Sequence, residues 1–136
     1  MPKRGSEWKM ELTGRIINRG RTVGEALVSS DPISFYGGVD PETGKIADKD
    51  NKLDGVSIKD KILVFPFGKG STVGPYTIYQ LAKLGNAPKA MINVDCETIV
   101  AVGCIISDIP AVDHVNISKI KTGDKISVDG EKVTIK

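Results

Sequence analysis

The sequence has 136 residues, of which 40% are hydrophobic and 26% are charged, a balance typical of one globular domain and not of a disordered or fibrous chain. Nineteen basic and seventeen acidic side chains leave a formal charge of +2, too small to indicate a nucleic-acid-binding protein. No apolar run approaches the ~20 residues that a membrane-spanning helix requires, and no apolar signal core follows the first four residues, so we expect a single cytoplasmic domain over residues 1–136 that binds neither nucleic acid nor membrane.

The two cysteines, Cys96 and Cys104, indicate neither a disulfide nor a metal site. His114 follows them, and this spacing matches no zinc ribbon or zinc finger. Two thiolates are also too few for an ordinary four-cysteine iron–sulfur cluster. In a reducing compartment both side chains should stay thiols and be buried as small apolar residues. We therefore predict that this chain alone holds no metal.

Two strands and a long irregular region are predicted in the first half of the chain. Residues 8–17 alternate loosely between polar and apolar side chains, which is typical of an edge strand with one dry face. Residues 25–29 form a second short strand that ends before Pro32, because proline cannot donate to a β-ladder. Residues 35–60 are dense in turn-forming residues, and we expect a long loop there, which commonly carries function.

A strand, a tight loop and a helix are predicted in direct succession. Residues 61–67 form an apolar run led by branched and aromatic side chains, as expected of a strand that is buried on both faces. The glycine-rich loop covers residues 68–74. Residues 75–84 place apolar side chains at helical spacing, and Gly85 ends the predicted helix.

In the last part of the chain, the sequence pattern predicts one more helix, with strands before and after it. Residues 97–107 are apolar nearly throughout and fit a short buried helix or a strand; Ala101 and Gly103 favour the helix, because small residues allow close packing. The remaining predictions are a core strand over 87–95, an extended segment over 109–112, and a hairpin over 125–135 that turns at Asp129-Gly130. Without a repeat or a linker, the pattern favours one compact α/β domain.

The loop of residues 68–74 (Gly-Lys-Gly-Ser-Thr-Val-Gly) is the candidate functional site. A glycine-rich turn before a helix presents unpaired backbone N–H groups and the positive end of the helix dipole, and anions bind to both. The loop matches neither a P-loop nor the GxGxxG pattern, which requires glycine in place of Val73, so a nucleotide site is disfavoured. Glycine and serine in such a turn can also serve only geometry and helix capping, and both interpretations stay open.

The side chains of this loop that could carry chemistry are Lys69, Ser71 and Thr72. Nothing in the sequence assigns His114 to Ser71 as a base, so a Ser-His-Asp hydrolase is disfavoured. The helix terminus and nearby N–H groups could instead stabilise a Ser71 alkoxide as an acid or base, with a partner that supplies the rest of the site. Residues 34–40 (Ser-Phe-Tyr-Gly-Gly-Val-Asp) could add backbone amides and a carboxylate, although a solvated turn explains them equally well.

Several motifs, taken in order, resemble the small subunit of the aconitase X family. They are Gly37-Gly38-Val39-Asp40, Asp54-Gly55, the loop of residues 68–74, and Ile109-Pro110-Ala111-Val112-Asp113. The resemblance spans nearly the whole chain. It implies an aconitase-type swivelling β/β/α domain that pairs with a separate large subunit. It also implies that a 4Fe-4S cluster is held by that large subunit and that none is bound by this chain alone.

The resemblance further implies an enzyme, a hydro-lyase that is active only with its large subunit. The archaeal members dehydrate (R)-5-phosphomevalonate to trans-anhydromevalonate 5-phosphate in the mevalonate pathway of isoprenoid biosynthesis. Ser71 would be the proton acceptor. The residues that would bind the substrate, a phosphorylated hydroxy acid, are Lys69, Gly70, Thr72 and Gly38.

The sequence departs from the family pattern in two places. Lys69 stands where arginine is common, and Pro75 stands where a small hydroxylated residue is frequent. Lysine binds anions as a point charge without the bidentate fork of arginine, and this difference bears on the ligand role of position 69.

Three alternatives remain beside this function. The chain could belong to another aconitase X dehydratase, such as one acting on hydroxyproline, with the same serine chemistry. It could be a non-catalytic module that senses a phosphorylated metabolite through residues 68–74. A phosphohistidine carrier is disfavoured, since it requires His114 in a glycine, threonine and serine context that Val112-Asp113-His114-Val115 does not provide.

Overall fold

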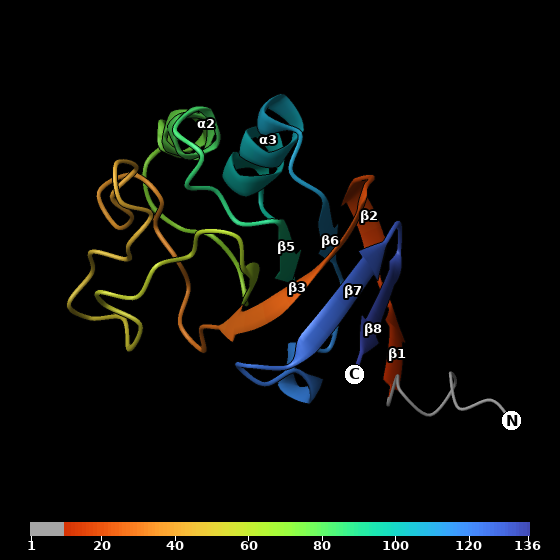
Figure 1. Ribbon diagram of the computed structural model, residues 1–136. Coiled ribbons are helices and arrows are strands. Elements are labelled where there is room, and N and C mark those ends of the chain that lie inside the picture. Colours follow the sequence, from red (N-terminus) through yellow and green to blue (C-terminus); the bar gives the residue numbers. More distant parts are fainter. Residues whose placement is uncertain (1–9) are drawn as a thin grey trace, which may run out of the picture.

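The computed structural model describes residues 10–136, which form a mixed β-sheet, two α-helices and a long loop (Figure 1). The elements in chain order are β1 (Met10–Thr13), β2 (Arg15–Asn18), β3 (Arg21–Val28), β4 (Ile62–Phe65), α2 (Gly74–Lys83), β5 (Ala90–Asn93), α3 (Thr98–Ser107), β6 (Ala111–Asp113), the 3-10 helix η1 (Ile117–Lys119), β7 (Lys125–Asp129) and β8 (Lys132–Ile135). Neither α2 nor α3 has the length and apolar character to cross a membrane.

The eight strands form one sheet in the order β1-β8-β7-β3-β4-β5-β6-β2. The strands β3, β4, β5 and β6 run parallel to one another, and the other pairings are antiparallel. Because β1 and β2 are consecutive in the chain but lie at opposite ends of this order, the sheet curls back on itself. The result is nearly a barrel, with α2 and α3 side by side over one part of it (Figure 1).

Strand β4 divides the core into two layers. Its four residues are fully buried, as predicted for residues 61–67, and successive side chains point to opposite faces. Leu63 and Phe65 pack toward the helices and the long loop, in the same cluster as Ile78 of α2. Ile62 and Val64 pack on the other face, with side chains from β7 and β8. The strand therefore fixes the loop that follows it between two packed layers.

The prediction of one continuous edge strand over residues 8–17 is wrong. Residues 8 and 9 lie outside the described part of the chain, and the rest form two strands, β1 and β2, that separate at Gly14. A β-carbon at Gly14 would collide with the Asp113 carbonyl, so only glycine allows this close approach. The Gly14 N–H donates to the Glu131 carbonyl at 2.8 Å, and the chain passes there from one end of the sheet to the other.

The other elements follow the predictions with shifted boundaries. The helix interpretation of residues 97–107 is confirmed as α3, whose N-terminus is capped by the Glu97 carboxylate. Strand β3 starts at Arg21, earlier than residue 25, because its first five residues pair with β7. The hairpin loop consists of Gly130 and Glu131, one position later than predicted. The long irregular region predicted over residues 35–60 is confirmed.

Candidate active site

The loop that joins β4 to α2 lies at the carboxyl edge of the parallel strands, where ligand sites of α/β sheets commonly form. It is tied to the loop after β5, since the N–H groups of Val94 and Asp95 both donate to the Pro66 carbonyl at 3.1 Å. At Gly68 a β-carbon would meet the Glu97 carboxylate at 2.8 Å, so glycine lets the loop approach the start of α3. The loop is therefore held at its base, and Lys69, Gly70, Ser71 and Thr72 are exposed beyond it.

The chain that leads into the long loop runs alongside residues 68–70. It places Ser34 between Gly70 and Gly38, two of the predicted site residues. Ile33 and Gly68 form a parallel bridge, with the Lys69 N–H donating to the Ile33 carbonyl at 3.0 Å. Gly70 has φ +100°, and a β-carbon there would lie 2.5 Å from the Ser34 hydroxyl oxygen. A β-carbon at Gly38 would collide with the Ser34 carbonyl. Both glycines are thus required by their close approach to Ser34.

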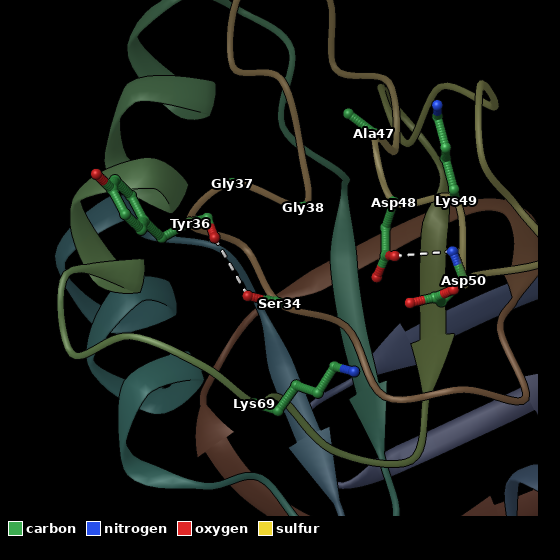
Figure 2. A pocket seen from close by; sticks show the side chains of 9 residues that line it. All are labelled: Ser34, Tyr36, Gly37, Gly38, Ala47, Asp48, Lys49, Asp50 and Lys69. Carbon is green, nitrogen blue, oxygen red and sulfur yellow. Dashed lines mark hydrogen bonds between the residues drawn. The ribbon is translucent and has the colours of Figure 1, made fainter.

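These segments surround an open hollow of about 340 Å³ (Figure 2). It is lined by polar and small residues from three parts of the chain: Ser34, Tyr36, Gly37, Gly38, Ala47, Asp48, Lys49, Asp50 and Lys69. The structure thereby brings together Lys69 and Gly38, two of the residues predicted to bind substrate. Ser71 and Thr72 are not part of its lining.

Ser71 is exposed and lies three residues before the first residue of α2. Its hydroxyl oxygen accepts a hydrogen bond from the Val73 N–H at 3.2 Å, and its carbonyl accepts one from the Gly74 N–H at 3.0 Å. Helix α2 has no side-chain cap and no acidic residue in its first turn, so the positive end of its dipole is not neutralised there. Backbone dipoles that point at a serine oxygen favour its negatively charged form.

The N–H groups of Gly70, Ser71 and Thr72 form the second chemical feature of this loop. Within residues 10–136 no acceptor receives a hydrogen bond from any of these three consecutive groups. Consecutive unpartnered backbone donors in a turn form a concave anion-binding surface. With the Lys69 ammonium next to them in the chain, they can hold a carboxylate or a phosphate.

A second hollow, of about 380 Å³, lies between the long loop and α2. Asp40 lines it together with Thr77 and Gln80 of the helix. The Asp40 carboxylate accepts a hydrogen bond from the Glu42 N–H at 2.9 Å within its own turn. Asp40, considered in the sequence as a neighbour of the loop, therefore lines a different hollow from Lys69.

A buried charged group that sequence reasoning missed lies at the end of β6. The Asp113 carboxylate is fully buried and accepts two hydrogen bonds from the Arg15 guanidinium, at 2.9 and 2.8 Å, and one from the Cys96 N–H at 2.8 Å. Burial opposes ionisation of Asp113, but the bonds from Arg15 and Cys96 outweigh it and hold its pKa below the ordinary value. No local signal could have revealed this pair, because its partners are 98 positions apart.

His114 and Asp95 lie beside this carboxylate. The imidazole Nε2 is 3.6 Å from the Asp95 carboxylate and 3.9 Å from that of Asp113, and His114 has a left-handed backbone with φ +59°. One ligand atom from each of the three side chains lies within 4.8 Å of the other two, as a metal site would need. Because Arg15 already occupies both oxygens of Asp113, the group is better described as an ion-pair network.

The two cysteines do not provide an iron–sulfur ligand set. Burial, with the nearby carboxylates of Asp113 and Glu97, raises the pKa of the Cys96 thiol to about 12. Burial also raises the pKa of the Cys104 thiol. An ordinary cluster is held by four thiolates, and residues 10–136 contain only these two cysteines. The donor set of residues 10–136 therefore does not fit an iron–sulfur cluster.

Comparisons with known proteins agree on one family. A family model described as "Aconitase X swivel domain" matches residues 11–136. The chain is similar to the phosphomevalonate dehydratase small subunit of Thermococcus kodakarensis, with 58% identity over 90% of this chain and 92% of that protein. It is also similar to the protein of the same name from Methanocaldococcus jannaschii, with 55% identity over 93% of this chain and 97% of that one.

Solved structures give the same result for the fold. The crystal structure of Thermococcus kodakaraensis aconitase X in its holo-form superposes with a TM-score of 0.93 and 55% identity, and the match covers 94% of this chain and 99% of the other. The solution NMR structure of a UPF0107 protein superposes with a TM-score of 0.85 and 45% identity over 93% and 99% of the two chains. The predicted swivelling β/β/α fold is confirmed.

Proposed function

This chain belongs to the aconitase X swivel-domain family, and we propose that it is the small subunit of a phosphomevalonate dehydratase. The reaction removes water from (R)-5-phosphomevalonate and forms trans-anhydromevalonate 5-phosphate in the archaeal mevalonate pathway. The names and the extent of similarity of its relatives support this proposal. The single structural observation that carries it is the exposed Ser71 at a loop whose backbone donors are free.

Ser71 is the proton acceptor in this proposal. Its alkoxide takes a proton from the carbon next to the substrate carboxylate, and the electrons of that C–H bond form the C=C bond. The hydroxyl on the neighbouring carbon departs and, with a proton, becomes water. The Val73 N–H and the start of α2 stabilise the Ser71 alkoxide before the proton arrives.

The substrate is negatively charged at both ends, and the loop offers matching donors. The N–H groups of Gly70 and Thr72 and the Lys69 ammonium hold one oxyanion group of the substrate. This contact places the acidic carbon next to Ser71, which is one residue from each of those amides. Positioning and charge stabilisation together supply most of the rate enhancement that such a site can give.

A large subunit completes the site in this proposal. The loop and the hollow are open, and Ser71 is exposed, whereas an alkoxide needs a site that excludes water. Since the two cysteines of this chain are too few for an ordinary four-thiolate cluster, we place the 4Fe-4S cluster in the large subunit. When bound there, it supplies a Lewis acid for the departing hydroxyl.

The experiment that tests this function is a reconstitution of the small subunit with its large partner, followed by an assay of alternative substrates. With (R)-5-phosphomevalonate we expect the absorbance of an enoate to rise, and neither subunit alone should produce it. Turnover of a hydroxyproline substrate in its place would assign the chain to the other aconitase X activity. Binding of phosphomevalonate without turnover by an assembled, cluster-loaded complex would favour a sensor and contradict the proposal.

A further inference from the structure

We propose that Ser34 is a further substrate-binding residue, whose hydroxyl acts with the Lys69 ammonium to hold an oxyanion group of the substrate in the open hollow. The proposal rests on the proposed function, and the sequence pointed to residues 34–40 only for their backbone amides and a carboxylate, not for the Ser34 hydroxyl. The ligand chemistry is an oxyanion, either the phosphate or the carboxylate of a phosphorylated hydroxy acid.

The position of Ser34 is the first argument. It is half-buried and lines the hollow, in contact range of Gly70 on one side and Gly38 on the other. Its hydroxyl oxygen occupies the space that a side chain at Gly70 would need. Ser34 is therefore the link between the two glycine segments that the family motifs contain, and its oxygen lies directly beside the loop that carries Ser71.

The distribution of charge in the hollow is the second argument. Lys69 forms no ion pair with any of residues 10–136, and Figure 2 shows its amino end turned toward the hollow from the same side as Ser34. Asp48, Lys49 and Asp50 line the opposite side, where the Asp50 N–H donates to the Asp48 carboxylate at 3.0 Å and the Lys49 amino end points away from Lys69 (Figure 2). An anion is repelled by the two carboxylates, whose charge the single Lys49 ammonium offsets only in part, and is attracted to the Lys69 ammonium beside Ser34.

The hydrogen bond that Ser34 now makes is the third argument. Its hydroxyl donates to the Tyr36 carbonyl at 3.2 Å, a long bond for an O–H donor, and Tyr36 is exposed. Water can replace the hydroxyl at this carbonyl when the hydroxyl turns toward a substrate oxygen. The exchange trades a long neutral hydrogen bond for a charge-assisted one, which is about twice as strong.

The replacement Ser34→Ala isolates the hydroxyl. Alanine keeps the β-carbon and the carbonyl that contact Gly38, and it removes only the oxygen beside Gly70. The matched control is Ser30→Ala, which removes an exposed hydroxyl from the same segment outside the hollow. The melting temperatures of both variants should equal that of the wild type, which checks that neither change disturbs folding.

The test measures kcat and KM of the reconstituted complex for (R)-5-phosphomevalonate, and the inhibition constants of inorganic phosphate and acetate at constant ionic strength. We expect Ser34→Ala to raise KM about tenfold while kcat changes less than about twofold, since one hydrogen bond to a charged group is lost. It should also weaken inhibition by one of the two anions, and that anion identifies the group that Ser34 holds. Ser30→Ala should leave every constant unchanged.

Two results would overturn the proposal. One is a KM and a pair of inhibition constants that Ser34→Ala leaves unchanged. The other is a fall in kcat at constant KM, which would make Ser34 a support of the Ser71 loop and not a ligand. If the complex does not dehydrate phosphomevalonate, the proposed function fails separately, and titration of the complex with phosphate and acetate still decides whether Ser34 binds an oxyanion.

Discussion

Two groups of polar residues at the carboxyl edge of the parallel strands differ in how the chain satisfies them. At the end of β6, the Asp113 carboxylate accepts three hydrogen bonds from N–H groups of Arg15 and Cys96. After β4, three consecutive N–H groups, from Gly70 to Thr72, donate to no acceptor in residues 10–136. The two groups lie in connected loops, because the His114 N–H donates to the Val94 carbonyl and the Val94 N–H donates to the Pro66 carbonyl.

This difference indicates that the group at Asp113 serves stability and that the group from Gly70 to Thr72 serves ligand binding. A buried carboxylate that accepts three hydrogen bonds, two of them from Arg15 of β2, holds β2 against β6 and closes the curled sheet. Exposed donors without a partner in the described part of the chain add no hydrogen bond to the fold and remain available to a ligand. We therefore expect changes in the loop after β4 to reduce turnover without lowering stability. Changes at Asp113, at the end of β6, should lower stability.

The largest expected effect is on turnover by Ser71→Ala. Because the serine is exposed and its hydroxyl accepts, within residues 10–136, only the Val73 N–H, we expect the melting temperature and assembly with the large subunit to be unchanged. Turnover should fall by about 10³-fold, the contribution of a positioned general base. A variant that keeps more than a tenth of wild-type kcat would contradict the assignment of Ser71 as the proton acceptor.

The next effect is on stability, in Asp113→Asn. The change removes charge from a buried group that accepts three hydrogen bonds, and we expect the free energy of unfolding to fall by about 2 kcal/mol. Chemical denaturation measures it. The matched control is Asp129→Asn, whose partner Arg21 is exposed, as is Asp129 itself; this change should cost less than about 0.5 kcal/mol. Equal losses of unfolding free energy in the two variants would show that buried Asp113 contributes no more to stability than the exposed ion pair of Asp129 with Arg21.

Asp113→Asn should also change how the stability of the protein depends on pH. The pKa of Asp113 is lowered in the folded state, so its ionised form stabilises the protein above the ordinary pKa of about 4. This contribution is lost as the pH falls through the lowered folded pKa. Wild-type stability should therefore fall with acid below about pH 4 more steeply than that of Asp113→Asn. Parallel acid profiles would show that Asp113 is not a stabilising charge.

A smaller effect is expected for Gly70→Ala. Its φ of +100° strains any side chain, and the new β-carbon would lie 2.5 Å from the Ser34 hydroxyl oxygen. Gly123→Ala is the matched control, because its φ is +96° and a β-carbon there meets nothing within 4 Å. Both should lose about 1 kcal/mol of stability through backbone strain, but only Gly70→Ala should also lose turnover, since it displaces the Ser71 loop.

The sequence revealed those parts of the fold that depend on neighbours in the chain. The apolar run of β4, the loop after it and α2 could be predicted because side-chain periodicity and glycine mark local structure. The break at Gly14 could not, since it depends on the Asp113 carbonyl, which comes from a distant part of the chain. The pairing of Arg15 with Asp113 was hidden for the same reason.

The candidate site shows the same limit. Lys69, Gly70, Ser71 and Thr72 are consecutive, and a glycine-rich turn before a helix points to them directly. Gly38 entered through the family motif, and the structure places it beside the same hollow as Lys69. The sequence did not predict that the hollow is also lined by Ser34, Asp48 and Asp50. Their positions depend on the course of the long loop, and an irregular loop has no periodic pattern from which its course could be predicted.

Amide hydrogen exchange tests the central contrast most directly, because it reads each N–H group separately. In the isolated chain we predict that the Cys96 N–H, which donates to buried Asp113, exchanges slowly, and that the N–H groups of Gly70, Ser71 and Thr72 exchange at nearly the rate of an unprotected peptide. In the assembled complex, saturating substrate should slow those three groups and leave Cys96 unchanged. Exchange at Gly70 to Thr72 as slow as at Cys96 before any ligand is added would contradict the account.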